Sequence, residues 1–472
     1  MSGMIKVGGN GGSSNNPPKI RNFRQEGLLE SNFFDIKYIA EDFENTILRH
    51  YIYIDGQKKE ITKDVGYEKP NNEFNYRVSN LKINTMYKIQ IEVTDGIETV
   101  RSDILSISTA NKSLFGIRVM ENNSNPKTCC TYIDDAVGIS PFTSTSLGGW
   151  SNKFPFNQIK LVGFKNGQET KDINPKNKSS YLDGSVVPSD VDVMVKIPKI
   201  YWNITSISNG YEIRISNVKY DSNYDCYAHK VRGVEKDFIY VGAYLGYVES
   251  NKLRSKSRVV PTTNYSLSEF RKFAQANGSG YQQINWYTYK LLQILFVLGF
   301  KNLDSQNALG RGMVNGSSTT NGGTDTSGLV YGTTSTNQQI CFLGVENLWG
   351  TFLQMLDGVI YDISRRIRVT SNNADFNDSG SGYEQIGTSS FNSNRNYIGE
   401  VEKGNKTIFF PLKLDGSQST YYCDEGYVAT DRLFTVGGNS SDNLASGIFH
   451  IYLYYQKTYG NGAVTSRLCY LG

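Results

Sequence analysis

The chain has 472 residues, with 49 Lys and Arg against 45 Asp and Glu and a formal net charge of +4 at pH 7. Only 20% of the residues are charged, so there is no broad basic field to hold nucleic acid or an anionic membrane, and we expect neither as a partner bound through bulk charge. The length predicts about three domains. The 46 Gly and 32 Tyr against 11 Pro favour short strands and glycine turns, which predicts a mainly β protein with α+β parts.

Six cysteines are spread along the chain, at Cys129, Cys130, Cys226, Cys341, Cys423 and Cys469. Because no pair has C-x-x-C spacing, we expect buried core thiols rather than a disulfide scaffold. The residues after Met1 contain no apolar segment, so we expect no secretory signal. The longest apolar run begins at Leu291 and has about half of the roughly 20 residues that a membrane span needs.

The N-terminal part predicts a flexible segment followed by a β-sandwich. Residues 1–16 are rich in Gly, Ser and Asn and are expected to be flexible or ordered by a partner. Residues 17–110 contain three segments with alternating apolar residues, two of them followed by Asp-Gly turns. Leu81 and Tyr87 in LKINTMYKIQIEVTDG resemble the E–F corner of a fibronectin type III domain, which implies a spacer. Residues 17–110 depart from that family because they contain no Trp, whereas the family usually buries one on its second strand.

Residues 111–180 are expected to form a linker and the leading strands of the next domain, with a strand over residues 115–120. Asp134 and Asp135 are adjacent, so in an extended chain they point to opposite faces. The pair therefore predicts a turn rather than a metal or catalytic site. This segment is similar to one common near the start of the distal domain in tail-fibre and tail-tip proteins of phages that infect Gram-positive bacteria.

Residues 181–472 are predicted to form one α+β domain. Two strands are expected at 191–206 and 210–220 around a Ser-Asn-Gly turn. Ser266 and Glu269 form a capping-box signature, which predicts a short helix that ends before Gly278. A second helix over residues 286–298 is apolar on all faces and should be buried. The polar stretch 315–328 predicts an exposed loop.

The strongest motif is GVENLWGTFLQMLDG, at residues 344–358. It resembles the core of the formylglycine-generating-enzyme type of C-type lectin fold, which includes the tropism-determining lectins of phage tail tips. Further short motifs of this family occur in the same order along the chain, namely RVVP at 258–261, Gly437-Gly438 and Ser466-Arg467-Leu468. The resemblance covers roughly residues 115–472 and implies a C-type-lectin-like, receptor-binding domain.

The motif residues are expected to be structural. Glu346 and Asn347 are polar among apolar neighbours, so if buried they must hydrogen-bond the backbone and tie long loops to the core. Trp349 is expected to anchor the core, and Arg467 to pair with Glu346 or Asp357. Alternatively, Glu346, Asn347 and Asp357 could offer oxygen ligands to Ca²⁺. No other metal or cofactor is expected.

No set of residues predicts catalysis. The formylglycine-generating branch uses two active-site cysteines near the C-terminus that bind copper, whereas Cys423 and Cys469 lie far apart in the sequence and form no matching pair. The chain has no H-E-x-x-H, G-x-S-x-G or P-loop motif. We therefore expect a protein without enzymatic activity.

Recognition has a better candidate, because the resemblance implies a ligand surface in the last third of the domain. Tyr offers a large contact area at low conformational cost, while Asn and Ser adapt to polar ligands. Alternate residues of a strand face opposite sides, so about half of these tyrosines are expected in core or subunit packing. The candidates are Tyr421, Tyr422, Asp424, Tyr427, Asn439, Ser440, Asp442, Asn443, Tyr452, Tyr454, Tyr455 and Tyr459.

The sequence thus predicts a non-enzymatic receptor-binding protein in the tail tip or fibre of a phage or phage-tail-like particle, assembled in the host cytoplasm. It would attach to a bacterial surface glycan or surface-layer protein, contact other tail or baseplate proteins through its N-terminus, and form a homotrimer by family analogy. Two alternatives remain open. One is a virion structural or decoration protein of the capsid or baseplate, and the other is a formylglycine-generating-type enzyme or glycan hydrolase.

Overall fold

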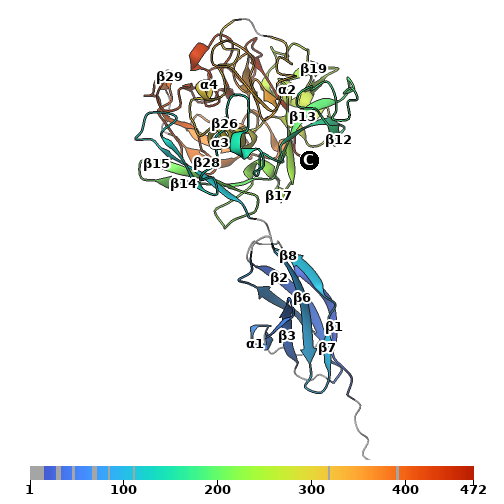
Figure 1. Cartoon of the computed structure of the whole chain (residues 1–472). Coiled ribbons are helices and arrows are strands. Elements are labelled where there is room, and N and C mark those ends of the chain that lie inside the picture. The colour runs from blue at the N-terminus through green and yellow to red at the C-terminus, as the bar shows by residue number, and fades with distance from the viewer. Residues whose placement is uncertain are drawn as a thin grey trace, which may run out of the picture. The chain divides into compact units, whose positions relative to one another are not determined.

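The computed structural model describes residues 15–27, 33–44, 48–65, 72–82, 85–109, 112–316, 319–389 and 393–472. The chain divides into two compact units, residues 1–112 and 113–472, called here the small unit and the large unit (Figure 1). Most of the expected flexible segment, residues 1–14, lies outside the described residues. Strands predominate in both units, which confirms the mainly β class.

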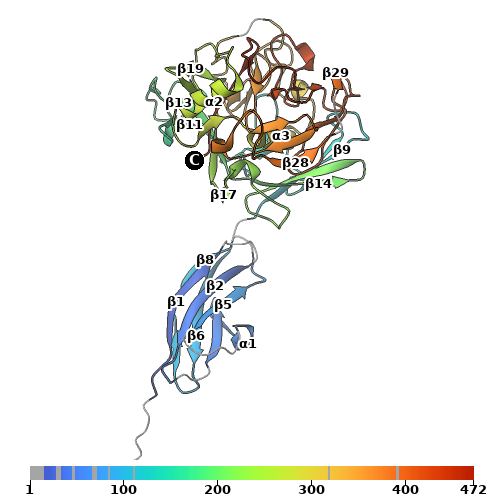
Figure 2. The same cartoon turned by 180° about the vertical axis from the view of Figure 1, so that it is seen from behind.

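Two antiparallel sheets form the small unit (Figure 2). The first holds, in spatial order, β1 (Lys19–Glu26), β2 (Phe34–Glu41) and β5 (Asn72–Val78). The second holds β4 (Gln57–Glu60), β3 (Arg49–Ile54) and β6 (Met86–Thr94), with β7 (Thr99–Arg101) and β8 (Leu105–Ser108) both paired to β6. The one-turn helix α1 (Thr62–Val65) separates β4 from β5.

The core of the small unit follows the alternation seen in the sequence. Along β2, Phe34, Ile36 and Tyr38 are buried, and the residues between them are partly exposed. The Tyr87 hydroxyl accepts a hydrogen bond of 2.7 Å from the backbone N–H of Lys82. This is a tyrosine-corner contact, in which the ring packs inside while its hydroxyl satisfies nearby backbone.

The large unit contains three larger sheets. One has the order β12 (Gln168–Asp172), β11 (Lys160–Lys165), β13 (Asp192–Pro198), β18 (Phe238–Gly242), β36 (Leu468–Tyr470) and β21 (Tyr281–Gln283). Another has the order β10 (Cys130–Asp134), β9 (Leu114–Met120), β15 (Gly210–Ser216) and β14 (Tyr201–Ile207). The third is made of short strands: β29 (Ser393–Tyr397), β32 (Glu425–Val428), β34 (Ile451–Tyr452), β33 (Thr435–Val436), β25 (Leu353–Met355) and β35 (Val464–Thr465).

Small sheets and hairpins complete the large unit. The three-stranded sheets are β22 (Val330–Tyr331), β23 (Cys341–Phe342) and β24 (Val345–Glu346), and β26 (Val359–Tyr361), β27 (Arg366–Val369) and β28 (Glu384–Thr388). The two-stranded ones are β16 (Lys230–Val231) with β17 (Val234–Glu235), β19 (Tyr247–Glu249) with β20 (Lys252–Arg254), and β30 (Glu400–Val401) with β31 (Pro411–Lys413).

The segment expected as a linker and leading strands belongs to the large unit from Ser113 onward. Its strand β9 is an inner strand of the four-stranded sheet, between β10 and β15. Trp150 is fully buried, with its ring 5.2 Å from that of Phe115 and 5.7 Å from that of Tyr132. The strands of this segment therefore lie in the same compact unit as residues 181–472. The local pattern predicts the strand but not its partner, because β15 lies far along the chain.

Two helices lie near their predicted positions. Helix α2 (Leu267–Gln275) starts with a complete capping box between Ser266 and Glu269. Every residue of α3 (Trp286–Phe300) is buried, and Figures 1 and 2 both show it within the body of the large unit. It runs two residues beyond the prediction and stops at Lys301, which adopts the left-handed conformation with φ 53°. A one-turn helix, α4 (Ser305–Ala308), follows.

All six cysteines lie among the described residues, are buried, and carry free thiols. No helix in the described part of the chain is both long and apolar enough to cross a membrane.

Candidate functional site

Glu346 fastens a long loop to the scaffold. Its carboxylate is fully buried and accepts hydrogen bonds from the backbone N–H groups of Gly322 (2.8 Å) and Thr324 (2.9 Å) and from the Thr324 hydroxyl (2.7 Å). Burial raises the pKa of Glu346, and these donors together with the Lys178 ammonium oppose that rise. The loop at 315–328 is therefore not simply exposed, as its polarity predicts: Asn321 and Thr324 are buried.

Asn347 and Trp349 lie in the core beside it. The Trp349 indole N–H donates to the Gly310 carbonyl at 3.2 Å, so the predicted anchor is also hydrogen-bonded. Asn347 adopts a left-handed φ of 53°. Its side-chain amide has no hydrogen-bond partner among the described residues, so the expected bond to the backbone is wrong for this side chain. Its main-chain carbonyl instead accepts from Gln354 (3.0 Å) and Arg467 (3.1 Å).

Arg467 is buried and forms no ion pair with any described residue, contrary to the expectation from the sequence. Its guanidinium donates to the Gln354 side-chain oxygen at 2.7 Å and to the carbonyls of Gly242 and Glu346 at 2.8 and 2.7 Å. Burial lowers its pKa to about 10. Asp357 pairs with Arg271 instead, at 2.8 Å. Both motif carboxylates are thus already partnered by this chain, and we do not propose calcium there.

Two of the candidate recognition residues are buried and cannot meet a ligand. Tyr422 is fully buried, with its hydroxyl 2.9 Å from that of Tyr211. Asp424 accepts from the backbone N–H of Phe449 at 2.8 Å, and burial raises its pKa well above the ordinary value. The prediction was wrong for both because the polarity of a side chain does not show which way the backbone turns it. Tyr421 is half-buried and lines a separate polar hollow.

The candidates Asn439, Ser440 and Asn443 lie on one loop that is held to the scaffold. The backbone N–H of Ser440 donates to the Thr351 carbonyl at 3.3 Å, and that of Asn443 to the Val314 carbonyl at 2.9 Å. Asp442 accepts from the backbone of Asn439 at 2.8 Å. These bonds leave Asn443 exposed and the other two candidates partly exposed.

Four of the remaining candidates converge on one open hollow of about 370 Å³, called here the tyrosine hollow, whereas Tyr452 does not line it. Tyr427 comes from β32, and Tyr454, Tyr455 and Tyr459 come from the segment after β34. Tyr454 is 55% exposed and Tyr459 is 73% exposed. The other lining residues are Arg432, Gln456, Gly460 and Asn461. Large aromatic surface beside polar groups is typical of a binding site.

Ring contacts link three tyrosines of the hollow, Tyr427, Tyr454 and Tyr455. The Tyr454 ring meets that of Tyr427 edge-on at 5.8 Å and that of Tyr455 edge-on at 5.5 Å. It is stacked on the half-buried Tyr452 at 5.6 Å, with an angle of 29° between the rings. Such contacts restrict the side chains before any ligand arrives, which lowers the entropy lost on binding.

Sequence reasoning missed Arg395, which joins the tyrosines to the 439–443 loop. Its guanidinium lies 5.6 Å from the Tyr452 ring centroid, pairs with Glu425, and pairs with Asp442 at 3.0 Å. No local motif could reveal it, because its partners come from separate parts of the chain.

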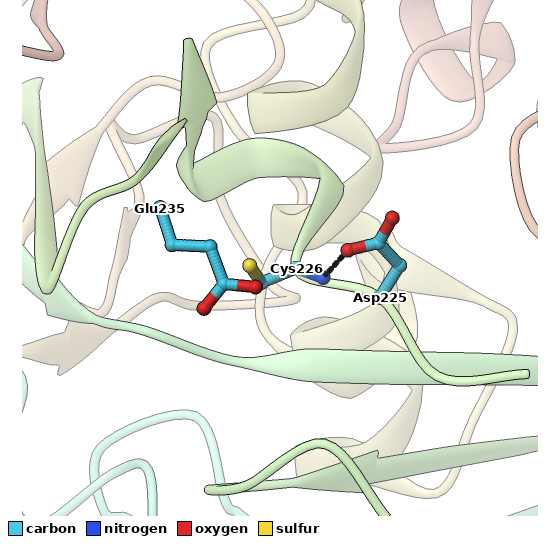
Figure 3. A group of neighbouring side chains, drawn as sticks. All are labelled: Asp225, Cys226 and Glu235. Atoms are coloured by element: carbon cyan, nitrogen blue, oxygen red, sulfur yellow. Dashed lines mark hydrogen bonds between the residues drawn. The ribbon is translucent and has the colours of Figure 1, made fainter. Parts of the chain in front are cut away.

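Asp225, Cys226 and Glu235 form a cluster that could suit a metal ion, with Cys226 between the two carboxylates (Figure 3). Asp225 pairs with Lys230, and Glu235 accepts from the Tyr201 hydroxyl. Burial raises the pKa of the Cys226 thiol to about 12, which disfavours the thiolate that metals bind. These partners make the cluster a structural ion-pair network.

No protein-family model and no curated protein matches this sequence. Among solved structures, the PKD domain of an M14-like peptidase from Thermoplasmatales archaeon SCGC AB-540-F20 is similar over 21% of this chain and 99% of its own, with 16% identity and a TM-score of 0.17. The U1 variant of the Major Tropism Determinant is similar over 82% of this chain and 81% of its own, with 12% identity and a TM-score of 0.28. At such low TM-scores, neither similarity carries an argument about this chain.

Proposed function

We propose that this chain is a non-enzymatic receptor-binding protein in the tail tip or fibre of a phage or phage-tail-like particle, and that the tyrosine hollow attaches to a bacterial surface glycan or surface protein. One observation carries the proposal: Tyr427, Tyr454, Tyr455 and Tyr459 converge on one open hollow. The resemblance of the 344–358 motif to phage-tip lectins supports the phage context. Its most polar residues serve the scaffold, an arrangement that separates stability from specificity.

The state of the thiols and imidazoles supports a binding protein rather than an enzyme. Burial raises the pKa of Cys469 to about 12 and also raises that of Cys423. His229 and His450 are buried, and burial lowers the pKa of each. Groups in these environments are poorly suited to act as nucleophile or general base.

The small unit would serve as a spacer, and the N-terminus would contact other tail or baseplate proteins. We propose a homotrimer, because three copies of a weak site would together hold a cell surface firmly. Light scattering of the purified full chain measures the mass directly, and a monomeric mass at micromolar concentration contradicts this part of the proposal.

The test uses the fluorescently labelled full chain on a panel of Gram-positive cells. We expect saturable binding and block of phage adsorption, and at least a tenfold loss of binding when Tyr454→Ala and Tyr459→Ala are combined. Tyr220→Ala is the matched control, because Tyr220 is an exposed tyrosine outside the hollow. Equal binding by the double variant and the wild type would remove the hollow from the proposal.

The alternatives are decided by separate measurements. Gold labelling over the capsid or baseplate, without binding to cells, would favour a structural or decoration protein. Release of sugar from cell-wall polysaccharide, or conversion of a peptide cysteine to formylglycine, would favour an enzyme.

A further inference from the structure

We propose that the tyrosine hollow binds a sugar unit that carries a carboxylate or a phosphate, with the anion at Arg432 and the sugar ring against the tyrosines. The inference rests on the proposed function and names the ligand class of the same site. It favours a charged glycan over a surface protein as the receptor.

The charge in the hollow carries the first step. Arg432 lines it, and no carboxylate of the described residues lies within ion-pair distance of its guanidinium. The nearby cations differ, because Lys457 pairs with Asp431 at 2.6 Å and Arg395 pairs with Glu425 and Asp442. Among the described residues, no Asp or Glu lines the hollow. A guanidinium with free donors binds a carboxylate or phosphate through two parallel hydrogen bonds.

The aromatic surface carries the second step. A pyranose has apolar C–H faces and hydroxyls around its edge. The exposed rings of Tyr454 and Tyr459 offer flat apolar surface, and the amides of Gln456 and Asn461 lie in the same lining. Rings and amides together match a sugar, because a purely ionic ligand needs no aromatic surface.

The size and shape of the hollow carry the third step. Its volume of about 370 Å³ lies at the low end of the range for small-molecule sites. One wall is fixed by Gly460, where a Cβ atom would stand 2.1 Å from the backbone oxygen of Asn264. The Asn264 N–H donates to the Asn461 carbonyl at 3.2 Å, and the Leu433 N–H to the Tyr455 carbonyl at 2.9 Å. A small, preformed hollow fits one or two sugar units better than a protein surface.

Calorimetry with the full chain and three probes tests the ligand class: oligogalacturonate supplies carboxylates, glycerol-phosphate teichoic acid supplies phosphates, and dextran is neutral. We expect binding of at least one anionic probe, weaker binding at higher salt, and no binding of dextran. Arg432→Gln should lower the affinity at least tenfold. Arg232→Gln is the control, because it removes the same charge from an exposed position outside the hollow. Circular dichroism shows that both variants fold.

The outcomes separate this inference from the proposed function. Binding of a single anionic probe supports the inference and identifies the anion. Equal binding of dextran, or no effect of Arg432→Gln, overturns the inference. If Tyr454→Ala with Tyr459→Ala still abolishes attachment to cells in that case, the proposed function stands with another ligand. If the tyrosine variants also bind cells normally, both fail.

Discussion

Several polar side chains of this protein lie where water cannot solvate them. Lys290 on α3 is one of them, and no carboxylate pairs with it in the described part of the chain. Its ammonium lies 4.0 Å from the centroid of the Trp286 ring, which compensates only part of the desolvation cost. Burial lowers its pKa well below the ordinary value. His50, in the small unit, is buried between Tyr38 and Phe74.

Lys290→Met should stabilise the large unit by roughly 1–3 kcal/mol at pH 7, because it removes an amine that folding must desolvate or neutralise. The gain should shrink as the pH rises towards the ordinary lysine pKa of about 10.4, where the unfolded amine is neutral too. Urea unfolding followed by tryptophan fluorescence measures it, with Lys290→Arg as the charge-retaining control. A loss of stability in Lys290→Met would mean that the ammonium makes a favourable contact.

Acid should weaken the small unit through His50. Burial lowers its folded pKa to about 4, against about 6.5 when unfolded. A group with a lowered folded pKa gives its full stability above pH 6.5 and loses it as the pH falls through 4. We expect a loss of about 2 kcal/mol between pH 7 and pH 4.5 from this group.

Hydrogen exchange of peptides from β3 and β6, corrected for the intrinsic rate at each pH, measures this loss in the full chain. His50→Phe keeps an aromatic ring beside Phe74 but cannot bind a proton. It should be less stable at pH 7, because the Tyr38 hydroxyl loses its 2.9 Å partner, and should lack this part of the acid loss. An unchanged pH dependence in His50→Phe rules out His50 as the cause.

At the scale of elements, predictions that depend on residues close together in the sequence agree best with the structure. The capping box of α2 and the uniformly apolar α3 depend on residues within a few positions, and both helices form where predicted. In the tyrosine-rich segment after Phe449, strand β34 ends at Tyr452, but the burial of successive side chains continues to alternate beyond it. Leu453 is buried and Tyr454 is exposed, while Tyr455 is half-buried. Alternation alone does not select the residues of the hollow, because the neighbours Tyr454 and Tyr455 both line it, together with Tyr459.

Ser266→Ala should destabilise the large unit by about 1 kcal/mol, because the Glu269 N–H at the start of α2 loses its acceptor. Glu269→Gln is the control: a glutamine can still accept from the Ser266 N–H, so a few tenths of a kcal/mol are expected. Urea unfolding monitored by tryptophan fluorescence reads both. Equal losses in the two variants would show that the charge of Glu269, rather than the cap, provides the stability.

At the scale of the whole molecule, each unit has its own core. The buried clusters of the small and large units share no residue, and all four tryptophans, Trp150, Trp202, Trp286 and Trp349, belong to the large unit. Tryptophan fluorescence therefore reports on the large unit alone, even in the full chain.

A fragment of residues 113–472 should fold by itself, and its affinity for cells per binding site should equal that of the full chain. Its tryptophan unfolding midpoint in urea should equal that of the full chain, because no buried cluster is removed with the small unit. A fragment of residues 181–472 is the contrasting control. It should fail to fold, because it lacks β9, β11 and Trp150. A much lower midpoint for 113–472 would contradict the independence of the units.

The sequence by itself determined the mainly β class and the positions of the two helices of the large unit. These depend on alternation, capping and composition, which act over a few residues. Only the tertiary structure decided that β9 pairs with β15, that Arg467 binds carbonyls while Asp357 pairs with Arg271, and that Tyr422 and Asp424 face inward. The tertiary structure also places Arg432 in the lining of the hollow, where no described carboxylate pairs with it. Each of these depends on partners far apart in the chain, whose meeting is set by how the whole core packs.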